Sequence, residues 1–322
     1  MQKRRKLLWM LVTLVFAGIF VYCLGVYQVV HFNSQMEIPE TGRNHVTTFK
    51  LYNGELRTAG GVKFYLDMGS RHNFITPATL RDLHAHGCKL RERPTLVLTV
   101  DPDGKQQIFL RKVSLNLELP DSLSTSGRTE IRNVEMFISD EEDGNILGMD
   151  FLERFCVECK VPSHEISLYR YAPDDYVQLT RLRAHGPTIF DRLGYSKFFC
   201  FTMRVNDEES HNYYLDTGRT MRNLALVQPA RDTLRASTRL KFNPEIGAPV
   251  QPRCRIHVAD RLKFGDVAYA DELSQHDYTI NPFVFFSQDF VVDFPQKRIM
   301  MHRTSGQRKI QDPVTREPIA YL

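Results

Sequence analysis

The sequence lacks net charge outside its first six residues. The 322 residues include 42 Lys and Arg against 38 Asp and Glu, which gives a formal net charge of +4. Lys3, Arg4, Arg5 and Lys6 account for all of it, so the rest of the chain is electrically balanced. A nucleic-acid-binding domain carries a basic patch or stripe, and composition gives no argument for one here.

Cysteine is also scarce. Five of the six cysteines lie outside the N-terminal apolar run: Cys88, Cys156, Cys159, Cys200 and Cys254. An odd number does not suggest a complete disulfide framework. Cys156 and Cys159 form Cys-x-x-Cys in a strand-like run, and no second pair follows at the spacing of a zinc site. We interpret both as small buried hydrophobic residues, and expect neither a metal nor an organic cofactor.

Only one long hydrophobic run is present, and it follows the four cations directly. Residues 7–30 are uncharged, and as a helix they would extend about 36 Å, enough to cross a hydrocarbon core of about 30 Å. The far end of the run offers no small-x-small cleavage site. We therefore predict an uncleaved signal anchor in residues 1–32, with the N-terminus cytoplasmic and the rest of the chain extracytoplasmic, periplasmic if bacterial. A cleaved signal and a buried soluble helix are the alternatives.

The remaining chain predicts an all-β fold with a few short helices. Residues 33–44 are polar and indicate a linker, and residues 172–190 are rich in Pro, Gly and Asp and indicate a connection. Between and after them lie two β-rich segments, residues 45–171 and 191–302, followed by a polar tail, residues 303–322. A length of 322 residues also favours two domains.

Local signals are clearest in the first β-rich segment. Thr76 is the expected N-cap of a short helix, with Pro77 at its first position and Gly87 closing it. Residues 97–100 and 108–110 are apolar and flank Asp-Pro-Asp-Gly, which predicts a hairpin. We consider this hairpin either a mobile flap over a cleft or an ordinary surface hairpin. Residues 113–119 alternate strictly, as a half-buried strand does.

The two β-rich segments repeat one another in outline. Each contains an apolar, aromatic-rich strand that ends in Asp-x-Gly: Asp-Met-Gly-Ser at residues 67–70 and Asp-Thr-Gly-Arg at residues 216–219. Each then closes with an apolar run and an aromatic-rich terminal strand. In the first segment the apolar run is Ile-Leu-Gly-Met-Asp-Phe-Leu at residues 146–152. A repeat of this length is too long for a solenoid and indicates two duplicated lobes.

On these motifs the chain resembles a tandem retropepsin-like aspartic peptidase of the clan AA type. The resemblance covers roughly residues 45–302 in outline and is clearest in the first half, where the Ile-Leu-Gly element follows the Asp-x-Gly about 80 residues later. It implies two retropepsin-like β-barrel lobes that form an intramolecular pseudo-dimer, with one Asp-x-Gly loop from each lobe at their interface.

The resemblance also implies roles for residues in both loops. Two carboxylates that share one proton can hydrolyse a peptide bond, because one activates water while its protonated neighbour polarises the carbonyl. Such a pair titrates as a unit. Glycine after the x residue permits the tight turn. The residues concerned are Asp67 and Asp216 as the catalytic pair, Ser70 and Thr217 as supporting hydroxyls, and Gly69 and Gly218 in the turns.

The sequence departs from the family pattern at three places. Met68 stands where the family has a hydroxyl that bonds across to the other loop, so we expect that network to be only half made. Arg219 follows the second Gly, and a guanidinium beside the pair would favour ionised carboxylates. Asn281 and Pro282 stand where the second lobe needs its hydrophobic-hydrophobic-Gly element.

Two functions from different classes follow. The first is a membrane-anchored aspartic endopeptidase that cleaves a peptide or protein substrate on the extracytoplasmic side. The second is a catalytically inactive peptidase-like module that binds a peptide or partner protein in the same cleft, with Asp67 and Asp216 only capping their own turns. Lobe pairing is expected within one chain, and pairing with lobes of another chain is the alternative.

Overall fold

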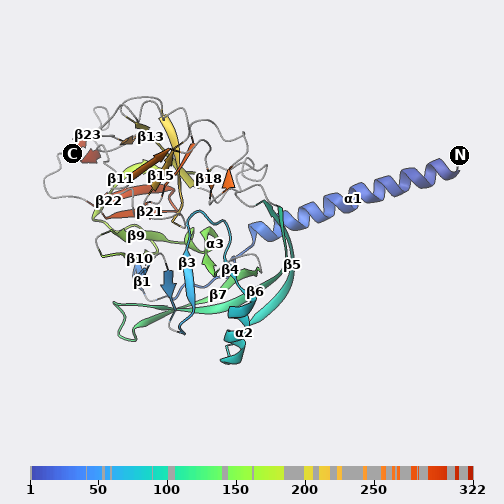
Figure 1. Cartoon of the computed structure of the whole chain (residues 1–322), viewed down its shortest axis with the longest axis horizontal. Coiled ribbons are helices and arrows are strands. Elements are labelled where there is room, and N and C mark those ends of the chain that lie inside the picture. The colour runs from blue at the N-terminus through green and yellow to red at the C-terminus, as the bar shows by residue number, and fades with distance from the viewer. Residues whose placement is uncertain are drawn as a thin grey trace.

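The computed structural model describes residues 2–40, 42–52, 55–58, 60–88, 90–100, 106–139, 144–161, 163–184, 199–205, 210–217, 223–226, 242–244, 255–258, 263–264, 267–268, 277–280, 282, 289–302, 309–311 and 318–321. The protein is built mostly of β-strands, with one long N-terminal helix and short helices elsewhere (Figure 1). This confirms the predicted fold class. Three large sheets carry the architecture: one in each lobe and one that joins them.

The N-terminal helix α1 (Gln2–Val30) projects away from the β-strands (Figure 1). Its apolar side chains are exposed, for example Trp9 at 69% and Phe20 at 68%. The stretch Arg5–Gly25 is long and apolar enough to cross a membrane, and a signal sequence has the same properties. An apolar surface that nothing in the described chain covers fits contact with lipid.

The residues that follow α1 pack onto the first lobe, although the sequence indicates a linker there. Phe32 and Asn33 are 4% and 1% exposed, and Met36 joins the main hydrophobic core. Farther on, Glu37 and Arg132 exchange backbone hydrogen bonds of 3.0 Å. These residues are buried by partners far along the chain, and the polar composition of the stretch itself does not indicate those partners.

The first-lobe sheet has seven strands in the order β2-β3-β8-β4-β7-β6-β5. Strands β5 and β6 form the predicted hairpin, and the residues that join them, 101–105, lie outside the described residues. In β6 the alternating side chains Val113, Leu115, Leu117 and Leu119 are all buried, as predicted. The strands are β2 (Glu55–Arg57), β3 (Lys63–Leu66), β4 (Phe74–Ile75), β5 (Arg91–Val100), β6 (Gln106–Pro120), β7 (Arg128–Ile138) and β8 (Ile146–Leu147).

Two short helices accompany this sheet: α2 (Pro77–Ala85) and α3 (Met149–Leu152). In α2 the Thr76 hydroxyl accepts a hydrogen bond from Thr79 N–H, and Pro77 occupies the first turn. Gly87 follows with φ +74°, a conformation that glycine adopts without strain. The predicted helix is therefore confirmed at both ends.

The second-lobe sheet repeats the central part of the first. Its order is β12-β13-β14-β20-β15-β17, and β16 pairs with β13. The strands are β12 (Arg183–Ala184), β13 (Phe199–Val205), β14 (Ser210–Leu215), β15 (Asn223–Leu226), β16 (Phe242–Pro244), β17 (Arg255–Val258) and β20 (Asp277–Ile280). The hairpins β18 (Lys263–Phe264) with β19 (Val267–Ala268), and β23 (Lys309–Gln311) with β24 (Pro318–Tyr321), stand apart, the latter in the tail.

Strand direction shows that the two lobes have the same topology. In the first lobe β3 runs parallel to β8, β8 antiparallel to β4, and β4 parallel to β7. In the second lobe β14 runs parallel to β20, β20 antiparallel to β15, and β15 parallel to β17. The strands that precede the two Asp-x-Gly loops, β3 and β14, are thus equivalent, as the repeat in the sequence indicates.

A third sheet of six strands joins the lobes, in the order β1-β10-β9-β21-β22-β11. It lies between the two lobe sheets in Figure 1. Its central contact pairs β9 with β21, from Cys156 opposite Asp293 to Cys159 opposite Phe290. The strands are β1 (His45–Lys50), β9 (Cys156–Lys160), β10 (Glu165–Tyr169), β11 (Tyr176–Arg181), β21 (Phe290–Asp293) and β22 (Arg298–His302). The expected connection, residues 172–190, therefore contributes strands β11 and β12.

Candidate active site

Asp67 lies at the end of β3 in a turn that its own side chain closes. Phe64 and Leu66 are buried and hold the strand in the core, and Asp67 itself is half-buried. The Asp67 N–H donates to the Leu147 carbonyl at 3.0 Å. The Asp67 Oδ1 atom accepts a hydrogen bond from Gly69 N–H at 2.8 Å. One carboxylate oxygen is therefore turned back toward the loop that carries it.

Asp216 occupies the equivalent place at the end of β14. Leu215, Asp216 and Thr217 are 2%, 4% and 6% exposed, so Asp216 is buried more deeply than Asp67. The sequence predicts that Gly218 permits the turn and that Arg219 favours ionised carboxylates. Both residues lie outside the described residues.

The Thr217 side chain crosses from the second loop to the first. Its Oγ1 atom accepts a hydrogen bond from Met68 N–H at 2.9 Å and donates one to the Leu66 carbonyl at 2.6 Å. Both backbone groups flank Asp67. Because a hydroxyl supplies one donor and two acceptor sites, one side chain satisfies both groups and fixes the position of the first loop.

Gly69 brings the second carboxylate against the same loop. A Cβ atom on Gly69 would lie 2.6 Å from Asp216 Oδ1 and 2.7 Å from its Cγ. Only glycine leaves room for this approach. Gly69 therefore lies against both candidate carboxylates: its N–H binds Asp67 and its α-carbon abuts Asp216.

The Met68 side chain cannot donate a hydrogen bond to the second loop as the Thr217 hydroxyl does to the first. Its side chain is 1% exposed and belongs to the main core. A thioether has no hydrogen to donate. Met68 thus contributes packing at a position where the symmetric arrangement has a second hydroxyl.

The Ile-Leu-Gly element supports the first loop from behind. A Cβ atom on Gly148 would lie 2.4 Å from the His72 carbonyl oxygen and 2.7 Å from that of Ser70. The Met149 N–H donates to the Ser70 carbonyl at 2.8 Å. Ser70 in turn donates its hydroxyl to the His72 carbonyl at 3.0 Å. The backbone of this element is therefore packed against the residues that follow Asp67.

In the second lobe β20 takes the place of β8, with Leu215 opposite Ile280 as Leu66 is opposite Leu147. The position equivalent to Gly148 is therefore Asn281, which lies outside the described residues, while Pro282 is buried.

Sequence reasoning missed a buried polar pair next to this element. His72 Nδ1 lies 2.7 Å from Asp150 Oδ2, and the two side chains are 2% and 0% exposed. The Asp150 N–H also donates to the Arg71 carbonyl at 3.1 Å. The sequence places His72 beside the Asp-x-Gly and Asp150 in the Ile-Leu-Gly motif, but nothing in it indicates that they meet.

The joining sheet carries two buried thiols, one buried phenol and one half-buried phenol, all with raised pKa values. Burial is the main cause of the raised pKa of Cys156, and Asp293, 3.1 Å from its Sγ, adds to it. Burial also raises the pKa of Cys159, with a contribution from Glu158. Burial and Glu158 raise the pKa of Tyr169 to about 12 and increase that of Tyr176 further. Both cysteines are buried, as predicted.

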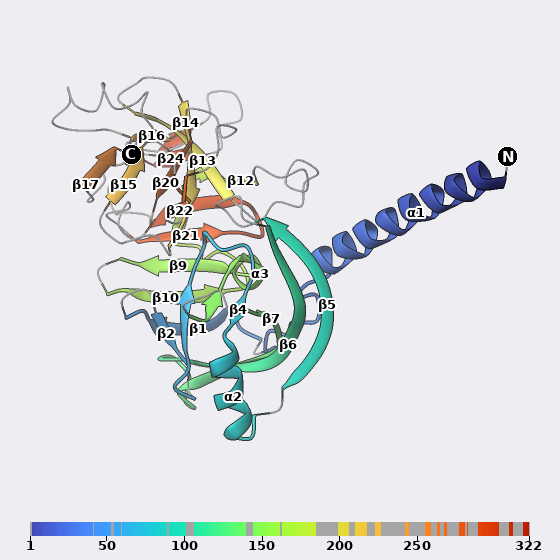
Figure 2. The same ribbon diagram turned by 45° about the vertical axis from the view of Figure 1, so that its right-hand side comes forward.

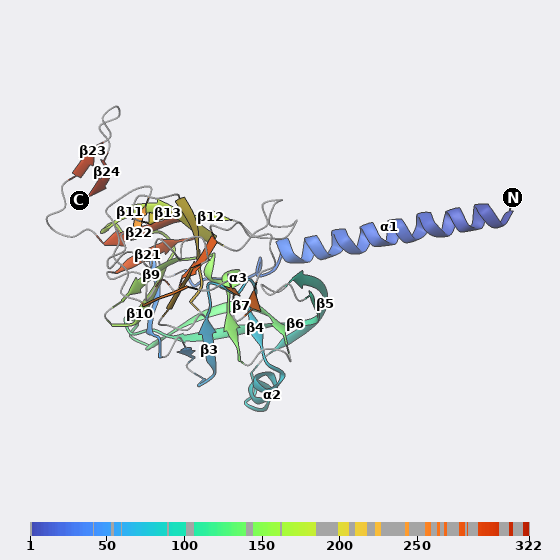
Figure 3. The same ribbon diagram turned by 45° about the horizontal axis from the view of Figure 1, so that its top comes forward.

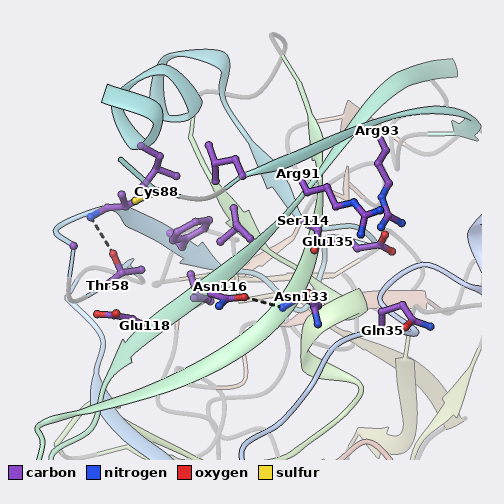
Figure 4. A pocket seen from close by; sticks show the side chains of 17 residues that line it. Gln35, Thr58, Cys88, Arg91, Arg93, Ser114, Asn116, Glu118, Asn133 and Glu135 are labelled. Atoms are coloured by element: carbon purple, nitrogen blue, oxygen red, sulfur yellow. Dashed lines mark hydrogen bonds between the residues drawn. The ribbon is translucent and has the colours of Figure 1, made fainter. Parts of the chain in front are cut away.

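A pocket of about 550 Å³ lies elsewhere in the first lobe. Its wall includes Phe64 and Leu115, and Figure 4 shows the side chains of Arg91 and Arg93 pointing toward Glu135. The described residues that line it include neither Asp67 nor Asp216. It is therefore distinct from the pair of loops. Within the described part of the chain, no three His, Cys, Asp or Glu side chains are grouped as a metal site would need.

No protein-family model matches the chain, and no curated protein matches it in sequence. Among solved structures it is similar to basic 7S globulin from soybean, at 10% identity and a TM-score of 0.48 over 81% of this chain and 97% of that one. It is also similar to conglutin gamma, a basic 7S globulin from lupine seeds, at 10% identity and a TM-score of 0.43 over 84% and 94%.

Proposed function

We propose that this protein is a membrane-anchored aspartic endopeptidase of the retropepsin-like type. The observation that carries the proposal is the contact between the two Asp-x-Gly loops. The Thr217 hydroxyl binds the backbone on both sides of Asp67, and the Asp216 carboxylate abuts Gly69. Contacts of this kind bring two carboxylates from equivalent strands to one place.

The proposed chemistry needs only these two groups and water. In this mechanism Asp67 and Asp216 share one proton, because two like charges about 3 Å apart cannot both ionise. The ionised member takes a proton from water, and the protonated member donates to the oxygen of the scissile carbonyl. Thr217 and Gly69 position the carboxylates. Ser70 holds the turn through its bond to the His72 carbonyl.

The alternative is an inactive module that binds a peptide between the lobes. The buried Met68 supports it, because the second hydroxyl of the cross-loop network is missing. The endopeptidase and the inactive binding module would have the same fold and would differ only in whether the bound peptide is cleaved.

We also propose that α1 stays attached and spans a membrane, with the lobes on the extracytoplasmic side. The exposed apolar surface of α1 and the burial of Phe32 and Asn33 directly after it support this. Washing isolated membranes with alkaline carbonate, which releases peripheral proteins, followed by the mass of the chain that stays in the membrane fraction, tests it. Release of a shorter soluble chain would contradict it.

The activity test is digestion of a peptide library from acid to neutral pH, with mass spectrometry of the new ends. Wild type should cleave, and Asp67→Asn and Asp216→Asn should both be inactive. Turnover equal to wild type in either variant would exclude this pair. A folded wild type with no turnover would leave the binding module, which retention of library peptides by the immobilised protein would then support.

A further inference from the structure

The end of the membrane anchor is built into the first lobe. The Phe32 ring stacks on Phe137 with centroids 4.4 Å apart, and Lys112 lies 5.6 Å above Phe32. Asn33 forms a reciprocal pair with Glu135: its N–H donates to Glu135 Oε2 at 2.9 Å, and its Oδ1 accepts from Glu135 N–H at 2.6 Å. Lys112 completes the cluster with an ion pair to Glu135 of 2.7 Å. Because all these groups are largely buried, the helix cannot swing freely on a linker.

The same residues touch the segment that follows Asp67. The rings of Phe32 and His72 lie 5.9 Å apart. Asn33 Nδ2 donates to the Asp150 carbonyl at 3.0 Å, and Asp150 holds His72. The residues at the end of the anchor therefore contact His72 and Asp150 directly, beside the loop that carries Asp67.

The anchor also contacts the hairpin that the sequence predicts as a flap. The Gln28 side chain accepts hydrogen bonds from the Thr95 hydroxyl and, at 3.4 Å, from Leu96 N–H. In Figures 1, 2 and 3 the end of β5 lies beside the C-terminal end of α1. The hairpin and the loop after Asp67 are thus fixed at the membrane end of the first lobe.

These contacts limit the height of the site above the membrane. The candidate span ends at Gly25. The seven residues from Gly25 to Phe32, most of them in α1, carry the chain only about 10 Å. Adding the distance of 5.9 Å between the Phe32 and His72 rings puts the segment after Asp67 about 16 Å from the end of the span.

We infer that the substrate is an extended segment of another membrane-bound protein, close to the membrane surface. This inference rests on the proposed peptidase function. An extended chain covers about 3.3–3.6 Å per residue, so the scissile bond must lie at least about five residues from the span that tethers it. When the tether is very long, the effective concentration of the scissile bond at the active site falls roughly as the −3/2 power of the tether length.

The experiment places the full chain in lipid vesicles together with single-span carriers. Each carrier presents a sequence found by the peptide-library digestion, with Gly/Ser spacers of about 3, 15 or 60 residues between the span and the scissile bond. The same sequence on a soluble carrier is the reference. Asp67→Asn protein serves as the blank.

We expect the spacer of about 15 residues, whose mean reach is about 21 Å, to be cleaved fastest. The spacer of about 60 residues should be about eightfold slower. The spacer of about 3 residues extends only about 10 Å and should not be cleaved. A matched variant carries an insertion of about 15 Gly/Ser residues between His31 and Phe32, which leaves Phe32 and Asn33 in place and should rescue cleavage of the shortest spacer.

Equal cleavage of all spacers and of the soluble carrier would overturn the substrate class and leave the peptidase proposal standing. Failure of the insertion to rescue the shortest spacer would also overturn it. Absence of cleavage above the Asp67→Asn blank in every format, including the peptide library, would overturn the peptidase proposal and this inference with it.

Discussion

The Thr217 hydroxyl is hydrogen-bonded at 2.9 Å to the backbone N–H of Met68, a residue 149 positions earlier in the chain. A side chain of the second lobe thus anchors the first loop, and the Met68 side chain, a thioether, donates no hydrogen bond in return.

Replacing Thr217 by Val should loosen this contact with little change in shape. Val removes the hydroxyl and leaves the buried Met68 N–H and Leu66 carbonyl without that partner, which costs about 1–3 kcal/mol. Thr217→Ser keeps the hydroxyl and should retain most of the stability. Chemical unfolding monitored by circular dichroism measures the difference. Equal losses in the two variants would show that the methyl group matters and the hydroxyl does not.

Adding a methyl group to Gly69 should inactivate the protein without unfolding it. The new Cβ would lie 2.6 Å from Asp216 Oδ1, which is the end of a side chain and can move aside. A displaced carboxylate lowers turnover by about 100-fold. Gly60→Ala is the control, because its nearest atom is Thr58 Oγ1 at 4.0 Å. Peptidase assays beside thermal melts would detect the predicted separation of activity from stability.

The same change at Gly148 should instead impair folding. Its Cβ would meet backbone oxygens of His72 and Ser70 at 2.4 and 2.7 Å, and backbone cannot move aside cheaply. We expect a loss of about 3 kcal/mol, at the upper end for overpacking. Gly60→Ala again provides the reference in urea unfolding. A Gly148→Ala protein as stable as this reference would contradict the packing described for the Ile-Leu-Gly element.

Removing His72 should destabilise the first lobe more than removing an exposed histidine. His72→Phe leaves the Asp150 carboxyl, which is 0% exposed, without its partner at 2.7 Å. Breaking a buried pair in this way costs about 3–5 kcal/mol. His84 is 53% exposed, so His84→Phe should change stability by no more than about 0.5 kcal/mol. Similar melting temperatures for the two variants would argue against a structural role of the His72–Asp150 pair.

The buried thiols predict a loss of stability at alkaline pH. The pKa values of Cys156 and Cys159 are raised in the folded protein, mainly by burial, whereas an unfolded thiol titrates near about 8.5. Above that pH the unfolded chain releases protons that the folded chain retains, so the free energy of unfolding falls as pH rises. The slope approaches about 1.4 kcal/mol per pH unit for each thiol.

Unfolding measured from neutral pH to pH of about 10 tests this slope. A Cys156→Ala, Cys159→Ala double variant should show a shallower fall than wild type. At neutral pH, iodoacetamide should modify the exposed Cys88 in the native protein, and reach the two buried thiols only after unfolding. Native alkylation of Cys156 or Cys159 at the rate of Cys88 would contradict their burial.

Local chemistry explains which features the sequence predicts well. The helix α2 follows from Thr76, Pro77 and Gly87, which act within a few residues of one another. The hairpin and the alternating strand β6 follow from periodicity in the same way. The equivalence of β3 and β14 could be inferred because both precede Asp-x-Gly.

Contacts between distant residues explain what the sequence does not reveal. Asn33 is a polar residue in a polar stretch, and its burial depends on Glu135, 102 residues later. His72 and Asp150 are separated by 78 positions. Nothing near any of these residues encodes its partner, so the polar stretch at residues 33–44 indicates only a linker. For Thr217 the partner could be anticipated only through the resemblance to a family.

The joining sheet has a consequence for biosynthesis. Strand β9 pairs on one side with residues 290–293, and β11 pairs with residues 298–302. While the chain is still emerging, β9 presents an open edge made largely of apolar residues, the kind of surface on which other chains aggregate. This edge of the first lobe is therefore covered only after residues 290–293 have been synthesised, and a chain that ends before residue 290 is prone to self-association.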